Sequence, residues 1–192
     1  SGQVLVDGQD VREYTFDALY DRVGYVTQKA VLFAGNIRDN VLFGESSAEQ
    51  TDENVKNAIE LAQASEFVDK LEEGIDSPIT QGGSNVSGGQ KQRLSIARAL
   101  ARKPEILIFD DSFSALDYKT DAMLRKGLAE KLEGTTCMIV AQRIGTIRHA
   151  DKIVVLDEGK AVGIGTHEEL IKTCDVYREI ALSQLSEQEL SR

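Results

Sequence analysis

The sequence has no long apolar run, few cysteines, and fewer basic than acidic residues. Its longest apolar runs, such as Ile106–Phe109 and Ile153–Leu156, fall far below the ~18 residues that a membrane-crossing helix needs. The two cysteines, Cys137 and Cys174, form neither a C-x-x-C pair nor a dense disulfide pattern, which indicates a reducing compartment. Acidic residues outnumber basic ones by 32 to 22, so nonspecific binding to nucleic acid or anionic lipid is disfavoured. The composition predicts one compact soluble domain.

The spacing of apolar residues predicts strands that alternate with helices. The segment 105–109 follows Pro104 and is apolar after Glu105. It leads into Asp110 and Asp111, as a buried parallel strand with acids at its carboxyl end would. The other expected strands and helices are strands at 4–6, 22–26, 136–141 and 152–157, helices at 36–71, 88–102, 117–132 and 144–149, and a final strand with two helices. This alternation predicts an α/β fold, with a mostly parallel sheet joined by right-handed crossovers and covered by helices on both faces.

A glycine-containing motif begins the helix expected at 88–102. In Val86-Ser87-Gly88-Gly89-Gln90, the two glycines would let a ligand approach the backbone N–H groups at the helix start, where phosphate binds favourably. Ser87 and Gln90 also fit a plain capping box, and the motif alone does not decide between the two interpretations. The strand that ends in Asp110 favours a nucleotide site, because such an aspartate lies beside nucleotide-bound Mg²⁺.

Four motifs in this order resemble the nucleotide-binding domain of ATP-binding cassette (ABC) transporters. They are Gln28 as the Q-loop glutamine, Val86–Gln90 as the signature motif, Ile106–Asp110 as Walker B, and Ser114-Ala115-Leu116-Asp117 as the D-loop. The stretches 32–40 and 165–170 are more similar to exporters than to importers. The resemblance covers essentially the whole chain. It implies a P-loop NTPase-like sheet with an α-helical subdomain inserted after the Q-loop.

The resemblance also implies roles for individual residues. Asp110 would hold Mg²⁺ through water, and Gln28 would sense the metal and the γ-phosphate of ATP while contacting the membrane domain. Because family members form head-to-tail dimers, Ser87, Gly88 and Gly89 would contact the nucleotide held by a second nucleotide-binding domain, and Asp117 would reach across the dimer. The implied ligands are ATP and Mg²⁺. The implied partners are that second domain and a transmembrane domain, which would place the chain at the cytoplasmic face of the cell membrane.

The family's phosphate-binding loop is missing from the sequence. No G-x-x-x-x-G-K-[ST] motif occurs, so the backbone cradle and lysine that hold the triphosphate are absent from these 192 residues. We expect that the chain is truncated before this segment, and a natural protein without a P-loop is the alternative. The resemblance then describes 1–192 as a partial nucleotide-binding domain, with 36–85 in the helical subdomain and 86–192 in the signature helix and C-terminal RecA-like core.

Two substitutions fall at the family's catalytic positions. Asp111 stands where a glutamate usually polarises the attacking water, and it is one methylene shorter. Gln142 stands where a histidine usually lies beside the γ-phosphate, and an amide cannot carry the proton or charge of imidazole. Together they resemble the degenerate half of a heterodimeric exporter. A homodimeric exporter with slow hydrolysis, and a soluble ABC ATPase acting on DNA or ribosomes, are the alternatives.

Other polar residues are expected to be structural. His149 and His167 do not form an H-E-x-x-H zinc motif, and Thr166 with Glu169 forms an ordinary capping box. A basic stripe on the signature helix is expected to face solvent. It consists of Lys91, Arg93, Arg98, Arg102 and Lys103.

Overall fold

The computed structural model describes residues 2–44, 46–132 and 134–185. They form two compact units, which meet in sequence between Val140 and Ala141. Composition alone predicts a single domain, whereas both units have a hydrophobic cluster of their own. No helix of the described residues is long and apolar enough to cross a membrane.

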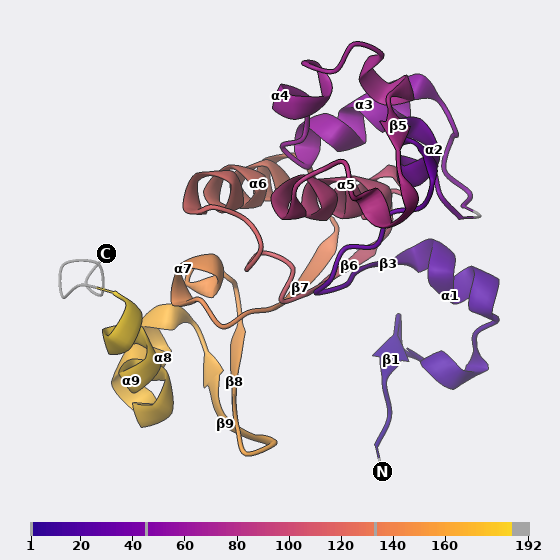
Figure 1. Ribbon diagram of the computed structural model, residues 1–192. Coiled ribbons are helices and arrows are strands. Elements are labelled where there is room, and N and C mark those ends of the chain that lie inside the picture. Colours follow the sequence, from indigo (N-terminus) through magenta and orange to yellow (C-terminus); the bar gives the residue numbers. More distant parts are fainter. Residues whose placement is uncertain (1, 45, 133, 186–192) are drawn as a thin grey trace. The chain divides into compact units, whose positions relative to one another are not determined.

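A parallel sheet forms the centre of the first unit. Its strands are β3 (Val23–Val26), β6 (Ile106–Asp110) and β7 (Thr136–Val140), in the order β3-β6-β7. Helix α5 (Gly88–Ala101) precedes β6, and helix α6 (Tyr118–Lys131) connects β6 with β7 (Figure 1). The predicted α/β fold with a parallel sheet is therefore confirmed.

The two faces of this sheet differ in burial. On one face Val26, Leu107 and Phe109 are fully buried in the main cluster. Side chains of the opposite face, including Tyr25, Met138 and Val140, are about half exposed. The prediction of a sheet covered on both faces is wrong for the described residues of this unit, because they supply helices to only one face. Parallel sheets in α/β proteins are normally buried on both faces.

Short helices follow β3, as the apolar spacing predicts. They are α2 (Ile37–Val41), α3 (Asp52–Leu61) and α4 (Ser65–Val68), followed by the 3₁₀ turns η2 (Gly74–Asp76) and η3 (Gln81–Gly83). The side chains of Asn36 and Thr51 accept backbone N–H groups and so begin α2 and α3. The two-residue strands β4 (Gly35–Asn36) and β5 (Pro78–Ile79) pair antiparallel. This pair joins the start of α2 to the segment that precedes the signature motif.

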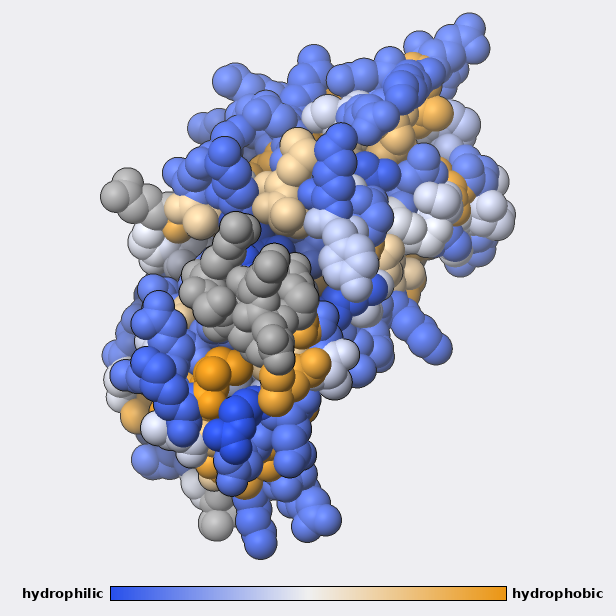
Figure 2. Space-filling model, turned by 90° about the vertical axis from the view of Figure 1, so that its left-hand side faces the viewer, coloured by the Kyte–Doolittle hydropathy of each residue, from blue (hydrophilic) through white to orange (hydrophobic). Residues whose placement is uncertain are grey.

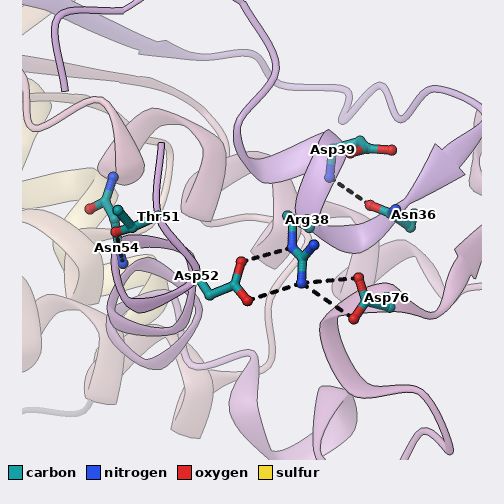
Figure 3. Close-up of polar contacts among 7 residues, drawn as sticks. All are labelled: Asn36, Arg38, Asp39, Thr51, Asp52, Asn54 and Asp76. Atoms are coloured by element: carbon teal, nitrogen blue, oxygen red, sulfur yellow. Dashed lines mark hydrogen bonds and ion pairs between the residues drawn. The ribbon is translucent and has the colours of Figure 1, made fainter. Parts of the chain in front are cut away.

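Arg38 connects three segments of this region (Figure 3). Its guanidinium lies 3.0 Å from Asp52 at the start of α3 and 3.1 Å from Asp76 at the end of η2. Because one planar guanidinium can bind two carboxylates, α2, α3 and η2 are held together at one point.

The first residues of this unit form two short strands and a helix. These are β1 (Leu5–Val6) and β2 (Gln9–Asp10), paired antiparallel, then η1 (Val11–Glu13) and α1 (Phe16–Arg22). Helix α1 is not predicted by the apolar spacing, because it has no buried residue. Its start is fixed by Thr15, whose hydroxyl accepts the N–H of Ala18.

The second unit is a hairpin packed against helices. It contains α7 (Ile144–Ile147), β8 (Ile153–Asp157), β9 (Lys160–Gly165), α8 (His167–Thr173) and α9 (Asp175–Gln184). Its core joins Ile153 and Val155 of β8 to Leu170 and Tyr177 of the helices. The predicted strand, turn, strand and two helices are confirmed here.

Most of the surface seen in Figure 2 is hydrophilic, in keeping with the 28% of charged residues. Apolar residues form separate orange patches in the lower part of that view. In the second unit, both strands of the hairpin expose apolar side chains, and on β8 these alternate with the buried Ile153 and Val155. The exposed side chains are Val154, Leu156, Val162 and Ile164.

Candidate nucleotide site

Asp110 and Asp111 lie at the carboxyl end of β6, the central strand of the sheet. Asp111 leaves the strand with φ of 46°, a left-handed conformation that aspartate tolerates better than most residues. The Asp111 N–H donates to the Val140 carbonyl oxygen at 2.9 Å, and the Asp111 carbonyl oxygen accepts from the Ser114 hydroxyl at 2.6 Å. The turn therefore directs two consecutive carboxylates from the end of the sheet, where α/β folds bind ligands.

The structure brings Gln28 to Asp111. The Gln28 Nε2 group donates to Asp111 Oδ2 at 3.0 Å, although the two residues are 83 positions apart in sequence. β3 pairs with β6 in parallel, so the residues that follow both strands meet at one edge. The predicted proximity of the Q-loop glutamine and the Walker B acids follows from this pairing.

Tyr25 also belongs to this edge, and the sequence gives no signal for it. Its hydroxyl donates to Asp110 Oδ2 at 2.8 Å. This hydrogen bond raises the pKa of Tyr25 above its ordinary value, and burial and the charge of Asp110 add to the effect. Tyr25 and Asp110 are two positions out of register on neighbouring strands, so their side chains emerge on the same face of the sheet.

Oxygen ligands of the kind that Mg²⁺ prefers are present at this edge. Mg²⁺ is usually bound by one or two carboxylates together with substrate phosphates and waters. Asp110 and Asp111 offer carboxylates, and Gln28 offers an amide oxygen while its Nε2 group is occupied by Asp111. No group of three or more His, Cys, Asp or Glu residues that could hold a metal alone was found among the described residues. The donors fit a phosphate-bound Mg²⁺ better than a cage made of protein alone.

The signature motif begins helix α5. Ser87 is the N-cap: its hydroxyl accepts the Gln90 N–H at 3.3 Å, while Gln90 Oε1 accepts the Ser87 N–H at 2.8 Å. The capping box considered from the sequence is therefore present. A Cβ on Gly88 would meet nothing within 4 Å, and one on Gly89 would meet only Ala115 O, at 3.6 Å. The capping hydrogen bonds thus explain Ser87 and Gln90, whereas no close contact within the chain requires glycine at Gly88 or Gly89.

The D-loop lies beside the signature motif, because Ala115 O is the atom that faces Gly89. Asp117 is the N-cap of α6, where it accepts the N–H of Thr120 at 2.9 Å and its hydroxyl at 2.7 Å. These hydrogen bonds lower the pKa of Asp117. Leu116 is buried, and Val86 is half-buried against the main cluster. A negative charge at Asp117 also suits the positive end of the α6 dipole.

Gln142 lies in the second unit, directly after the end of β7. Its carbonyl oxygen accepts from Gln184 Nε2 at 2.9 Å, and Gln184 Oε1 accepts the Ile144 N–H at 2.9 Å. One side chain of α9 therefore holds the backbone at Gln142. The pairing of Gln142 with Asp111 at one catalytic site stays a prediction.

Two arginines of the expected basic stripe are only partly exposed to solvent. Arg93 donates to Gln63 O at 2.7 Å and stacks 5.0 Å from the Phe67 ring centroid. Arg98 donates to Val31 O at 2.9 Å and to Asn40 O at 2.7 Å. Burial lowers the pKa of each guanidinium. The prediction of a solvated face is wrong at these two positions, since long side chains there hold loops against α5.

Comparison with known proteins agrees with this fold and site. A family model described as ABC transporter matches residues 1–114. An uncharacterized ABC transporter ATP-binding protein of Mycobacterium tuberculosis is 44% identical over 185 residues, covering 96% of this chain and 31% of the relative. Multidrug resistance protein 1 of Entamoeba histolytica is 40% identical over 192 residues, which is all of this chain and 15% of that protein.

A solved structure gives the same result. The chain superimposes on a bacterial Atm1-family ABC exporter with ATP bound at a TM-score of 0.90 and 34% identity, covering 97% of this chain and 33% of the exporter chain. The parallel sheet, the acids at the end of β6 and the capped, glycine-containing start of α5 define a P-loop NTPase-like nucleotide-binding domain. The chain belongs to the ABC transporter family, and its relatives include exporters. It spans a third or less of the length of the relatives named here.

Proposed function

We propose that this chain is the ATP-binding part of an ABC exporter, working in a head-to-tail pair of nucleotide-binding domains. Bound ATP with Mg²⁺ would supply the phosphoryl group whose transfer to water resets the pair. The observation that carries the proposal is the start of α5, where Gly88 and Gly89 leave the helix N-terminus open to a ligand. The family membership and the exporter relatives support it.

In this proposal, the residues of this chain contribute to two nucleotide sites, the chain's own site and the partner's site. Asp110 holds Mg²⁺ through water, and Gln28 responds to the metal and the γ-phosphate in the chain's own site. Ser87 and the N–H groups at Gly88 and Gly89 stabilise negative charge on the nucleotide of the partner's site. The D-loop residues Ser114–Asp117, which lie next to Gly89, reach across the dimer.

We further propose that a segment outside this chain supplies the P-loop. The uncovered sheet face supports this, since Met138 and Val140 are about half exposed on a parallel sheet that helices normally cover on both faces. In this view residues 36–85 belong to the helical subdomain, and residues 86–192 supply the signature helix and the C-terminal RecA-like core. The domain is partial over 1–192.

We propose that the chain's own site hydrolyses ATP slowly or not at all, so that the working partner is a different subunit. Asp111 is one methylene shorter than the usual glutamate, and displacement of a general base by ~1 Å costs about 10²-fold in rate. Gln142 cannot carry the charge of a histidine. The hydrogen bond from Gln28 to Asp111 further restricts the carboxylate that would act as base.

A transmembrane domain is the second proposed partner. A groove of about 780 Å³ opens next to the Q-loop, between Thr27, Phe43 and Arg98. The Arg98 guanidinium stacks over Phe43 at 5.5 Å and Phe33 at 5.4 Å, so an aromatic surface with a positive edge is available. This groove suits a short helix of the membrane domain, which would place the chain on the cytoplasmic side.

Two substitutions in the assembled transporter test this function. Ser87→Arg is expected to abolish ATP turnover, because a long cation would block the surface that covers the partner's nucleotide. Asp111→Ala is expected to lower turnover less than about 2-fold, since this carboxylate contributes little to the rate. Turnover per assembled pair is the measurement. Equal losses from both variants would contradict the degenerate site, and full turnover by copies of this chain alone would favour a homodimer.

A further inference from the structure

Gln92 is a buried amide on α5 that the roles above do not use. Gln92 is only 1% exposed, and its Nε2 group donates to the Thr27 carbonyl oxygen at 3.2 Å. Thr27 is the residue before Gln28. A buried amide costs free energy unless it is hydrogen-bonded, so an apolar residue would satisfy packing here as well as Gln92 does. The bond to Thr27 is what distinguishes a glutamine at this position.

Helix α5 holds the loop around Gln28 on both sides. Gln92 binds the backbone before Gln28, and Arg98 binds it after Gln28, through Val31 O at 2.9 Å. Thr27 adds a bond inside the loop, because its hydroxyl donates to Lys29 O at 2.7 Å. With its backbone fixed from both sides, Gln28 is presented to Asp111, which accepts its Nε2 group at 3.0 Å.

The same helix carries Ser87 at its N-terminus, five positions before Gln92. Side-chain bonds from one regular helix therefore connect the residue that would cover the partner's nucleotide to the loop that would sense the chain's own. The hydrogen bond that Gln92 donates goes to the backbone of Thr27 and to neither Ser87 nor Gln28. Its influence on either site passes through the Thr27 carbonyl.

We propose that Gln92 is a positioning residue that couples the two nucleotide sites. A movement of α5 when Ser87 engages the partner's ATP is passed by Gln92 to Gln28, and a change at Gln28 returns by the same route. This inference rests on the proposed function, since it needs Ser87 and Gln28 to serve different nucleotides. By this coupling, the degenerate site of this chain sets the rate of ATP hydrolysis at the partner's site.

The variant Gln92→Met isolates the hydrogen bond. Methionine keeps the length and volume of the side chain and removes the donor, while Thr27 is exposed, so water can replace the lost donor. Gln63→Met is the matched control, because Gln63 is a glutamine whose Nε2 group donates to Glu60 O at 3.3 Å within its own turn. Both substitutions preserve charge.

The test is a double-mutant cycle with Gln28→Ala, measured as ATP turnover of the assembled transporter. Gln92→Met is expected to lower kcat roughly 5- to 20-fold with KM for ATP within about 2-fold, and to have little further effect once Gln28 is alanine. Gln63→Met is expected to leave both constants unchanged. Additive losses, or an unchanged kcat for Gln92→Met, would overturn the coupling.

Hydrogen exchange distinguishes coupling from a folding defect. In Gln92→Met, backbone amides at 27–31 are expected to exchange faster while those at 94–101 in α5 keep their protection. Loss of protection in α5 itself would assign Gln92 a purely structural role and overturn the inference. Ser87→Arg separates the two claims: if it leaves turnover intact the proposed function fails, and if it abolishes turnover while Gln92→Met has no effect, the coupling alone fails.

Discussion

At the scale of single residues, Asp111 shows how the backbone limits a side chain that is proposed to act as a base. Its left-handed φ of 46° and the bonds to Val140 and Ser114 fix its Cα, so a shorter side chain cannot be compensated by a shift of the chain. The carboxylate is already within hydrogen-bonding distance of Gln28. The Asp111 carboxylate would therefore lie farther from a γ-phosphate than the carboxylate of a glutamate at this position.

Restoring the usual residues is expected to restore hydrolysis in the chain's own site. We predict that the double change Asp111→Glu with Gln142→His raises turnover at least about 10-fold when the partner's own catalytic site is inactivated, because general acid–base groups contribute 10²–10⁴-fold. Single-turnover kinetics with radiolabelled ATP measure this. The matched control is Asp121→Glu, an aspartate on α6 that pairs with Arg125 away from the site. If the double change does not raise turnover, the loss of hydrolysis at this site has causes beyond Asp111 and Gln142.

His167 gives a residue-scale prediction in the second unit. It is 8% exposed, its Nδ1 lies 2.8 Å from the Tyr177 hydroxyl, and its Nε2 is buried without a partner. Burial lowers the pKa of His167, the charges of Arg148 and His149 lower it further, and Glu168 opposes them. Burial also raises the pKa of Tyr177 to about 12, so the phenol stays neutral.

The sign of the resulting pH dependence follows from linkage. Because the folded pKa of His167 is below the unfolded value of 6.5, its contribution to stability is complete above pH 6.5 and is lost as the pH falls below it. We predict faster amide exchange in α8 and α9 at pH 5 than at pH 7.5, after correction for the intrinsic rate. His167→Gln should remove this dependence, and His149→Gln should keep it. A pH-independent protection of both helices would contradict the assignment.

At the scale of elements, Arg38 adds an ionic link to the packing between α2, α3 and η2. Its pairs with Asp52 and Asp76 are partly exposed, with Arg38 itself at 34%, so solvent weakens each of them. We predict that Arg38→Gln lowers the free energy of unfolding by ~0.5–1.5 kcal/mol, less at 1 M salt. The control Lys70→Gln removes an exposed i,i+4 pair with Glu66 and should cost about 0.5 kcal/mol or less. Denaturant midpoints measure both, and equal losses would contradict the link.

Elements that bury an apolar pattern could be predicted from the sequence, and the others could not. Strand β6 and helix α5 have strong patterns, since β6 is apolar up to Phe109 and α5 is capped by Ser87 and ends before Pro104. Helix α1 has no buried residue, and the β4–β5 pair has two residues in each strand, so neither gives a periodic signal.

The candidate site divides in the same way. Gln28, Asp110 and Asp111 could be predicted to meet, because residues after neighbouring parallel strands converge at one sheet edge. Tyr25 and Gln92 could not, since each acts through one long-range hydrogen bond that leaves no local pattern. The sequence also predicts that Arg93 and Arg98 face solvent. It gives no signal for their actual partners, which are backbone carbonyls of loops distant in sequence.

At the scale of the whole molecule, the proposed function divides this chain between two nucleotide sites. In that proposal Gln28, Asp110 and Asp111 belong to one site, and the open N-terminus of α5 completes another. Its formal charge of −10 disfavours nonspecific binding to a phosphate backbone, as the proposed function requires. The single property that follows most directly is asymmetry between the two bound nucleotides.

The measurement that tests this asymmetry is the fate of nucleotide in the assembled pair during turnover. Radiolabelled ATP is bound, unlabelled ATP is added, and the reaction is quenched after increasing times to separate ATP from ADP. We predict that one equivalent of labelled ATP remains unhydrolysed for at least about ten turnovers while the other is converted, since in the proposed function only one site has a competent base. Conversion of both equivalents at the same rate would contradict the account.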